Sequence, residues 1–391
     1  MTVSSPRGFR AAGVAAGIKD GGRLDLALVV NDGPGNAAAG VFTTNQVQAA
    51  PVLWSRQVLD GGTLRAVVLN SGGANACTGA QGFQTAHATA EKAAEVLGGG
   101  DDGWGAIEVA VCSTGLIGEQ LPRDAVLAGV EKAASGLAAG AQAGTAAATA
   151  VLTTDSRAKQ VLVTDPSGWS VGGFAKGAGM LAPAMATMLV VLTTDAVADA
   201  RTCDAALRAA VERTFNRLDV DGGTSTNDTV LLLASGASGV QASAEQLTAR
   251  VTEACAELCR ELQDDAEGAT KHVTISVRGA RSEADALAVA HTVSQDNLVK
   301  TAFFGSDPNW GRIAMAVGRA PGEVAADRLG ITLNGVAMCR DGVAAAGRDA
   351  ADLSGVDILV EIELGLGEGA AEVLTTDLSH AYVEENSAYS S

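Results

Sequence analysis

Aromatic side chains are scarce in this 391-residue chain: they make up 3% of it, with two tyrosines and four tryptophans. The apolar fraction of 47% is carried mainly by alanine, valine and leucine, and 48 glycines accompany them. Because small residues let backbones approach closely, this composition favours helices packed tightly on sheets, with many tight turns. The length suffices for one large domain or two ordinary ones with a sizeable core.

Metal-binding and redox motifs are also lacking. None of the six cysteines forms a C-x-x-C pair, and the four histidines show no zinc-type spacing. Cys255 and Cys259 stand four residues apart in a predicted helix, so they could be two metal ligands or two small apolar side chains on a packed face; packing is favoured. We therefore expect no metal and no redox cofactor, and reduced thiols of the kind found in cytosolic proteins.

No segment reads as a signal peptide or a membrane span. Residues 1–10 lack the apolar stretch of a signal peptide, and the longest apolar run, residues 188–192, is too short to cross a bilayer. The formal charge of −18 repels phosphate groups, which argues against a nucleic-acid or anionic-membrane partner. We expect a soluble, cytoplasmic protein.

Short β-branched runs alternate with alanine-rich helical stretches, which indicates an α/β fold. Asp195 and Ser243 are the expected N-caps of the second and third predicted helices. The predicted helices are 85–97, 196–215 and 244–264, and the predicted strands are 65–69, 107–112, 161–164, 188–193, 229–233, 272–277 and 358–362.

One glycine motif imitates a nucleotide-binding loop. Gly365, Gly367 and Ala370 follow a predicted strand with the spacing of a relaxed dinucleotide fingerprint. That motif needs a helix next, so that a pyrophosphate can lie at the helix N-terminus. Residues 372–376 instead predict a second strand, so we expect a hairpin here.

The most informative segment is KGAGMLAPAMATML, residues 176–189. A glycine-rich stretch runs through Pro183 into a buried strand that Thr187 opens. On residue type alone, a threonine in that place is an ordinary strand former. The flanking glycines and proline nevertheless allow close backbone approach and fix the direction of the chain.

This segment resembles the self-processing site of the ornithine acetyltransferase (ArgJ) family, the bifunctional glutamate N-acetyltransferase/amino-acid acetyltransferases. Further matches to the family extend over essentially the whole chain. They are residues 70–79 (NSGGANACTG), 112–118 (CSTGLIG), 221–228 (DGGTSTND), 267–271 (EGATK), 307–312 (DPNWGR) and 386–391 (NSAYSS).

The resemblance implies an ArgJ-type α/β sandwich that cuts itself between Ala186 and Thr187. An α-chain of residues 1–186 and a β-chain of residues 187–391 would result, and they would stay together as a heterotetramer of two α- and two β-chains. Thr187 would be the nucleophile, in the manner of N-terminal-nucleophile enzymes. Its freed α-amine, with a reference pKa of about 7.7–8.0, could then serve as the base for its own hydroxyl.

Other roles carry over from the family residue by residue. Thr114 and Gly115 would form the oxyanion hole, since an acyl-enzyme route needs fixed donors for the developing charge. Lys176 would anchor a carboxylate or depress the α-amine pKa, and Glu267 would hold a substrate ammonium. The family's substrate-binding positions in this chain are Thr153, Lys176, Thr187, Glu267, Asn386 and Ser391.

The implied reaction moves acetyl from N-acetylornithine to glutamate in arginine biosynthesis, through an acetyl-Thr187 intermediate. Acetyl-CoA is a possible second donor, and the residues leave its use open. Two alternatives also stay open: an N-terminal-nucleophile amidohydrolase or aminopeptidase, in which water takes the acyl group, and a non-catalytic binding protein of the same fold.

Overall fold

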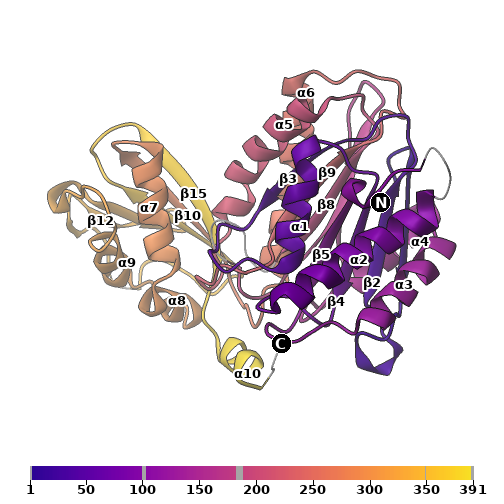
Figure 1. Cartoon of the computed structure of the whole chain (residues 1–391). Coiled ribbons are helices and arrows are strands. Elements are labelled where there is room, and N and C mark those ends of the chain that lie inside the picture. Colours follow the sequence, from indigo (N-terminus) through magenta and orange to yellow (C-terminus); the bar gives the residue numbers. More distant parts are fainter. Residues whose placement is uncertain (1, 99–102, 182–187, 348, 389–391) are drawn as a thin grey trace.

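Two β-sheets stack face to face in the larger part of the molecule (Figure 1). The computed structural model describes residues 2–98, 103–181, 188–347 and 349–388. One sheet has the order β1 (Phe9–Val14), β2 (Leu26–Asn31), β4 (Ala66–Ser71), β5 (Val109–Thr114). The other has the order β3 (Ala37–Phe42), β9 (Thr229–Ala234), β8 (Leu189–Thr194), β7 (Ser170–Lys176), β6 (Lys159–Thr164).

Helices cover the outer face of each sheet, so this part is a four-layer αββα sandwich. Strands β2, β4, β5, β8 and β9 are buried along their whole length, which explains their continuous apolar runs. On the four-stranded sheet lie α2 (Gly79–Gly98) and α3 (Arg123–Ser135), and on the five-stranded sheet α5 (Ala200–Arg213) and α6 (Ala244–Asp264). At the edges, α1 (Ala50–Val58) packs against β5 and α4 (Ala141–Ala150) against β1.

Helix α6 has the predicted bounds and the predicted cap. The Ser243 hydroxyl accepts a hydrogen bond from the Gln246 amide at 3.1 Å, and the Gln246 side chain accepts one from the Ser243 amide at 3.0 Å. This reciprocal capping box satisfies two helix-end donors. The apolar face of α6, which includes Cys255 and Cys259, packs into the sandwich core, so the packing interpretation of these thiols is confirmed.

The predicted cap of α5 was wrong. Asp199, not Asp195, accepts a hydrogen bond from the first turn, from the Thr202 amide at 2.7 Å. Val197 exchanges backbone hydrogen bonds with the chain near Gln241, which keeps residues 195–198 out of the helix. Asp195 instead accepts hydrogen bonds from Arg7 and from the Ser170 amide.

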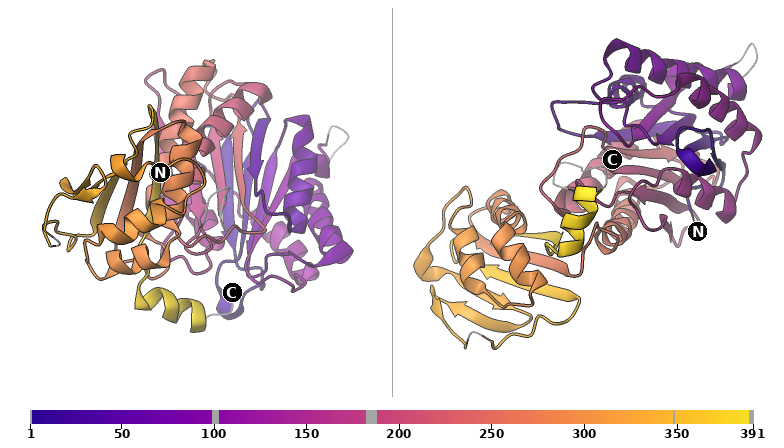
Figure 2. Two further views of the ribbon diagram at one scale, coloured as in Figure 1. Left: turned by 90° about the vertical axis from the view of Figure 1, so that its left-hand side faces the viewer. Right: turned by 90° about the horizontal axis from the view of Figure 1, so that it is seen from below.

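A smaller C-terminal lobe contains the third sheet (Figure 1). Its order is β13 (Val343–Ala344), β12 (Val336–Arg340), β11 (Gly330–Leu333), β14 (Asp357–Glu363), β10 (His272–Ala280), β15 (Gly369–Thr376). One face is covered by α7 (Glu283–Ser294), α8 (Asn297–Phe304) and α9 (Trp310–Val317). After β15 the chain returns toward the sandwich as α10 (His380–Ala388), as Figure 2 shows.

The strand expected after Gly367 exists, but the hairpin does not. Strand β10 lies between β14 and β15, pairing in parallel with the first and antiparallel with the second. The connection crosses the end of β10, because the Leu364 amide donates to the Arg278 carbonyl and the Leu366 amide to the Gly279 carbonyl. None of the described helices is long and apolar enough to cross a membrane.

The capping box of α6 gives a first prediction. Ser243→Ala removes one donor–acceptor pair of the box and should lower the free energy of unfolding by roughly 1 kcal/mol. Urea denaturation followed by circular dichroism measures this change. The control is Ser135→Ala, at an exposed position in the last turn of α3, which should leave the midpoint nearly unchanged; equal midpoints for both variants would contradict the role of the cap.

Candidate active site

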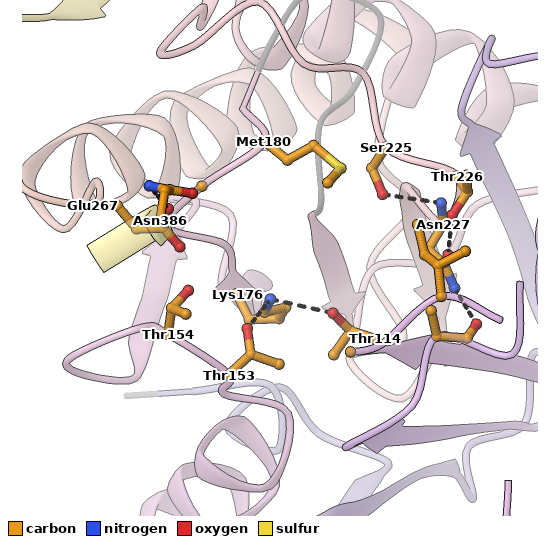
Figure 3. Close-up of a pocket in the computed structure, with 14 residues that line it drawn as sticks. Thr114, Thr153, Thr154, Lys176, Met180, Ser225, Thr226, Asn227, Glu267 and Asn386 are labelled. Carbon is orange, nitrogen blue, oxygen red and sulfur yellow. Dashed lines mark hydrogen bonds between the residues drawn. The ribbon is translucent and has the colours of Figure 1, made fainter. Parts of the chain in front are cut away.

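A pocket of about 630 Å³, open at its mouth, lies where β5 and β7 end (Figure 3). Thr114 is the last residue of β5 and Lys176 the last of β7. The segment before β9 and Asn386, near the end of α10, contribute further walls. The lining residues are Ala74, Thr114, Gly115, Ile117, Thr153, Thr154, Lys176, Gly179, Met180, Ser225, Thr226, Asn227, Glu267 and Asn386.

Most of the site residues predicted from the sequence line this one pocket, although they come from five separate segments. These residues are Thr114, Gly115, Thr153, Lys176, Glu267 and Asn386. Three further predicted residues, Ala186, Thr187 and Ser391, lie outside the described residues. The chemical roles assigned to all nine remain predictions.

Lys176 is a buried ammonium group that faces two threonine hydroxyls (Figure 3). Its Nζ donates to Thr153 Oγ1 at 2.8 Å and to Thr114 Oγ1 at 3.3 Å. Burial lowers the pKa of Lys176, and the nearby ammonium of Lys159 lowers it too, whereas the carboxylate of Asp155 acts in the opposite direction. Because Thr114 Oγ1 accepts from Lys176, the hydroxyl proton of Thr114 is left to donate elsewhere.

A chain of buried charges stands behind Lys176. The side chain of Asp155 is fully buried and lies 3.6 Å from Lys176 Nζ and 2.7 Å from Lys159 Nζ. Lys159 Nζ in turn lies 2.5 Å from Asp265. The Gly177 amide also donates to Asp155 at 2.6 Å. Burial by itself would raise the pKa of Asp155, but the two ammonium groups and these hydrogen bonds hold it well below the usual value.

The turn after β5 requires glycine. Gly115 has φ +132°, and a Cβ there would lie 2.5 Å from the Gly73 amide nitrogen. The Gly73 amide donates to the Thr114 carbonyl at 3.1 Å, and Asn227 Nδ2 donates to the Ser113 carbonyl at 2.8 Å. Carbonyl oxygens 113 and 114 are thus both engaged, and the turn is fixed on the pocket wall.

Glu267 is held between the glycine-rich segment and α10. Its amide donates to the Ala178 carbonyl at 2.9 Å, and its carboxylate accepts from Asn386 Nδ2 at 2.9 Å. A Cβ on Gly179 would lie 2.2 Å from Glu267 Oε2, so only glycine at 179 leaves room for the carboxylate. The pocket therefore offers one fixed carboxylate and one fixed ammonium group, on different walls.

Sequence reasoning gave no role to Asp155 or Asp228. Asp228 is fully buried, and its Oδ1 accepts from the Met188 amide at 2.9 Å, next to the predicted nucleophile in sequence. Its Oδ2 is buried without a hydrogen-bond partner in the described part of the chain. Burial raises the pKa of Asp228 well above its usual value, although Lys176 lowers it. Only their places in the sequence could have pointed to these two residues: Asp155 follows Thr153 by two residues, and Asp228 ends the 221–228 motif.

Among the residues that the structure describes, no group of three or more His, Cys, Asp or Glu side chains could hold a metal ion. Burial raises the pKa of Cys259 to about 12, and its Sγ donates to the Thr214 carbonyl at 3.7 Å. Cys255 and Cys259 therefore act as core side chains.

The fold and the pocket define an α/β protein that can bind a small charged molecule beside paired threonine hydroxyls. A sequence profile of the ArgJ family matches residues 10–391. The arginine biosynthesis bifunctional protein ArgJ of Mycolicibacterium paratuberculosis is 59% identical over 389 residues, covering 100% of this chain and 96% of that one. The protein of the same name from Thermobifida fusca is 52% identical over 390 residues, covering 100% of both chains.

A solved structure of ornithine acetyltransferase from Mycobacterium tuberculosis, complexed with ornithine, is 61% identical. It covers 47% of this chain and 96% of its own, with a TM-score of 0.46. On the profile match and the full-length relatives, the chain belongs to the ArgJ family.

The buried charge chain gives a second prediction. Asp155→Asn leaves two buried ammonium groups without their shared carboxylate, so the free energy of unfolding should fall by roughly 3–5 kcal/mol at pH 7. Because the folded-state pKa of Asp155 is depressed, its contribution is complete above its unfolded pKa of about 3.9 and is lost as the pH falls through the folded value. Urea denaturation at several pH values should show the difference from wild type shrinking only under acidic conditions.

The matched control is Asp204→Asn, which breaks the exposed ion pair with Arg208 and should change stability little. Equal losses in both variants, or a difference that does not depend on pH, would contradict the assignment of Asp155.

Proposed function

We propose that this protein is a self-processing acetyltransferase of arginine biosynthesis, which moves acetyl from N-acetylornithine to glutamate and releases ornithine. The observation that carries the proposal is a single pocket with an ammonium group, a carboxylate and threonine hydroxyls. These groups can bind the carboxylate, the ammonium and the acetyl group of an acetylated amino acid. The full-length relatives named arginine biosynthesis bifunctional protein ArgJ support the same activity.

Self-cleavage comes first in this proposal. Thr187 Oγ attacks the Ala186 carbonyl carbon, the C–N bond of that peptide breaks, and the nitrogen leaves as the α-amine of Thr187. Water then hydrolyses the resulting ester and restores the hydroxyl. Asp228 supports this chemistry, because its hydrogen bond to the Met188 amide restrains the residue that follows Thr187.

The two chains, 1–186 and 187–391, have a reason to stay together after cleavage. Strands β7 and β8 are antiparallel neighbours, with Lys176 opposite Leu189 at one end and Val171 opposite Thr194 at the other. Their ladder of hydrogen bonds joins the end of the first chain to the beginning of the second. The proposed assembly is a heterotetramer of two α- and two β-chains, acting in the cytoplasm.

Acetyl transfer then uses the same pocket twice. The α-amine of Thr187 takes the hydroxyl proton, the Oγ attacks the acetyl carbonyl of N-acetylornithine, and the proton passes to the leaving amine of ornithine. Glutamate enters next, and its amine takes the acetyl group from Thr187. The Thr114 hydroxyl and the Gly115 amide stabilise the oxyanion in both halves, while Lys176 and Glu267 hold the carboxylate and ammonium groups. Acetyl-CoA as an alternative donor belongs to the same proposal.

The direct test of the nucleophile is mass spectrometry of the denatured protein. Wild type should give two fragments, the second beginning at Thr187, and Thr187→Ala should stay intact. The purified wild type should transfer acetyl from N-acetylornithine to glutamate with release of ornithine. Loss of acetyl that does not require glutamate would instead identify a hydrolase, and an uncut, inactive wild type would leave only a binding protein.

The oxyanion assignment has a separate test. Thr114→Val removes the hydroxyl donor and should lower kcat roughly 10²–10³-fold, with a much smaller change in KM. Thr154→Val is the matched control, since Thr154 lines the same pocket and has no assigned role; its kcat should stay near that of wild type. A Thr114→Val enzyme that is fully cleaved and has normal kcat would remove Thr114 from the mechanism.

A further inference from the structure

A second cavity, of about 340 Å³, lies between the sandwich, helix α8 and the segment that leads into α10. It shares no lining residue with the catalytic pocket. By the same measure the catalytic pocket has about 630 Å³, so the second cavity is roughly half its size. The lining residues are Val220, Asp221, Gln295, Asn297, Lys300, Asp377, Leu378 and Tyr382.

Lys300 is a buried cation that faces this cavity without an ionic partner. It is 3% exposed and forms no ion pair within 4.0 Å in the described part of the chain, although the carboxylates of three aspartates, Asp219, Asp221 and Asp377, act on it from farther away. The Nζ donates to Thr375 Oγ1 at 3.1 Å and to the Thr376 carbonyl. An ammonium group has three donors, so one is left for the cavity. Burial lowers the pKa of Lys300 to about 8.

Lys271, another buried lysine of the same lobe, shows what a saturated ammonium group looks like. Its Nζ donates to three backbone carbonyls, those of Leu353, Ser354 and Gly355, at 2.9, 3.0 and 2.7 Å. All of its donors are used, and it lines no part of the cavity. The spare donor of Lys300 is therefore not a general property of buried lysines in this fold.

Asp221 supplies the opposite charge on the same cavity. Its two oxygens accept only backbone hydrogen bonds, from Met180 at 2.6 Å and from Gly223 at 3.1 Å, and no described cation lies within 4.0 Å of it. Burial raises the pKa of Asp221, and the neighbouring carboxylates of Glu267 and Asp219 raise it further. A cationic group beside Asp221 would relieve this repulsion.

The second carboxylate on the cavity wall is already occupied. Asp377 accepts from the Thr270 amide and hydroxyl and from the Lys271 amide. Asp221 and Asp377 together still outweigh Lys300 by one negative charge. Tyr382 stays a neutral hydroxyl, because burial raises its pKa to about 12.

We propose that this cavity is a second amino-acid site, which binds a basic α-amino acid with its carboxylate on Lys300 and an ammonium or guanidinium group on Asp221. A basic amino acid carries a net charge of about +1 at neutral pH, opposite to the net charge of the cavity wall. The site is separate from the proposed acetyl-transfer reaction, so it stands or falls independently of that function.

Hydrogen bonds connect the cavity to the catalytic pocket at two places. The Met180 amide is bound to Asp221, and Met180 lines the catalytic pocket. Asn386 Nδ2 donates both to the Tyr382 carbonyl at 3.0 Å and to Glu267. The two sites are therefore joined through Met180 and Asn386.

The experiment is isothermal titration calorimetry of the full, purified protein with L-arginine and L-lysine. Wild type should bind both, and Lys300→Met and Asp221→Asn should each weaken that binding roughly tenfold or more, because each removes a charge-assisted hydrogen bond. Lys176→Met, in the catalytic pocket, should keep it. L-glutamate, with the opposite net charge, should give no signal that depends on Lys300.

Lys271→Met is the matched control, a buried lysine replaced in the same way outside the cavity, and it should keep binding. Thermal melting of each variant checks that the lobe is folded; if Lys300→Met fails to fold, the isosteric Asp221→Asn decides the question. Absence of binding by wild type, or binding that survives Lys300→Met and Asp221→Asn but is lost in Lys176→Met, overturns the proposal.

Discussion

The buried charge chain Lys176–Asp155–Lys159–Asp265 is the constraint on which the catalytic pocket depends. Each ammonium group lies next to a carboxylate, so none of these charges is left unpaired in the low-dielectric interior, where an isolated charge is costly. The chain joins the ends of β7 and α6 to the start of β6. Two pocket residues are close in sequence to members of this charge chain: Thr153 precedes Asp155 by two residues, and Glu267 follows Asp265 by two.

The same constraint explains why the pocket forms from distant segments without relying on large apolar side chains. Polar and small residues make most of its walls, and Gly115 and Gly179 are placed where a methyl group would strike a backbone amide or the Glu267 carboxylate. The positions of the pocket residues are therefore set by charge pairing and by the close approach of backbone segments. The pocket presents the Thr114 hydroxyl from the end of β5 and the Thr153 hydroxyl from the loop between α4 and β6, where side chains are not used for core packing.

Much of the fold could be predicted from the sequence because the strongest signals are local. Continuous apolar runs located the buried strands β4, β5, β8 and β9, although the equally buried β2 was not predicted, and Ser243 located the start of α6. Two predictions failed where a distant partner decides: pairing of Val197 near Gln241 keeps residues 195–198 out of the helix, and β10 inserts between β14 and β15. The site residues came from family motifs, whereas Asp155 and Asp228 gain importance only from burial and pairing, which no local pattern shows.

One wall of the pocket is formed beside the two segments that link the sandwich to the C-terminal lobe. The chain passes into the C-terminal lobe before β10 and leaves it after β15, and Asp377 on the outgoing segment is bound to Thr270 and Lys271 on the incoming one. These hydrogen bonds hold the two crossing segments together. Glu267 lies just before the incoming segment and α10 follows the outgoing one, and the hydrogen bond from Asn386 to Glu267 joins them again at the pocket. The carboxylate wall of the pocket is therefore built where the two lobes meet, whereas its buried cation, Lys176, belongs to the sandwich.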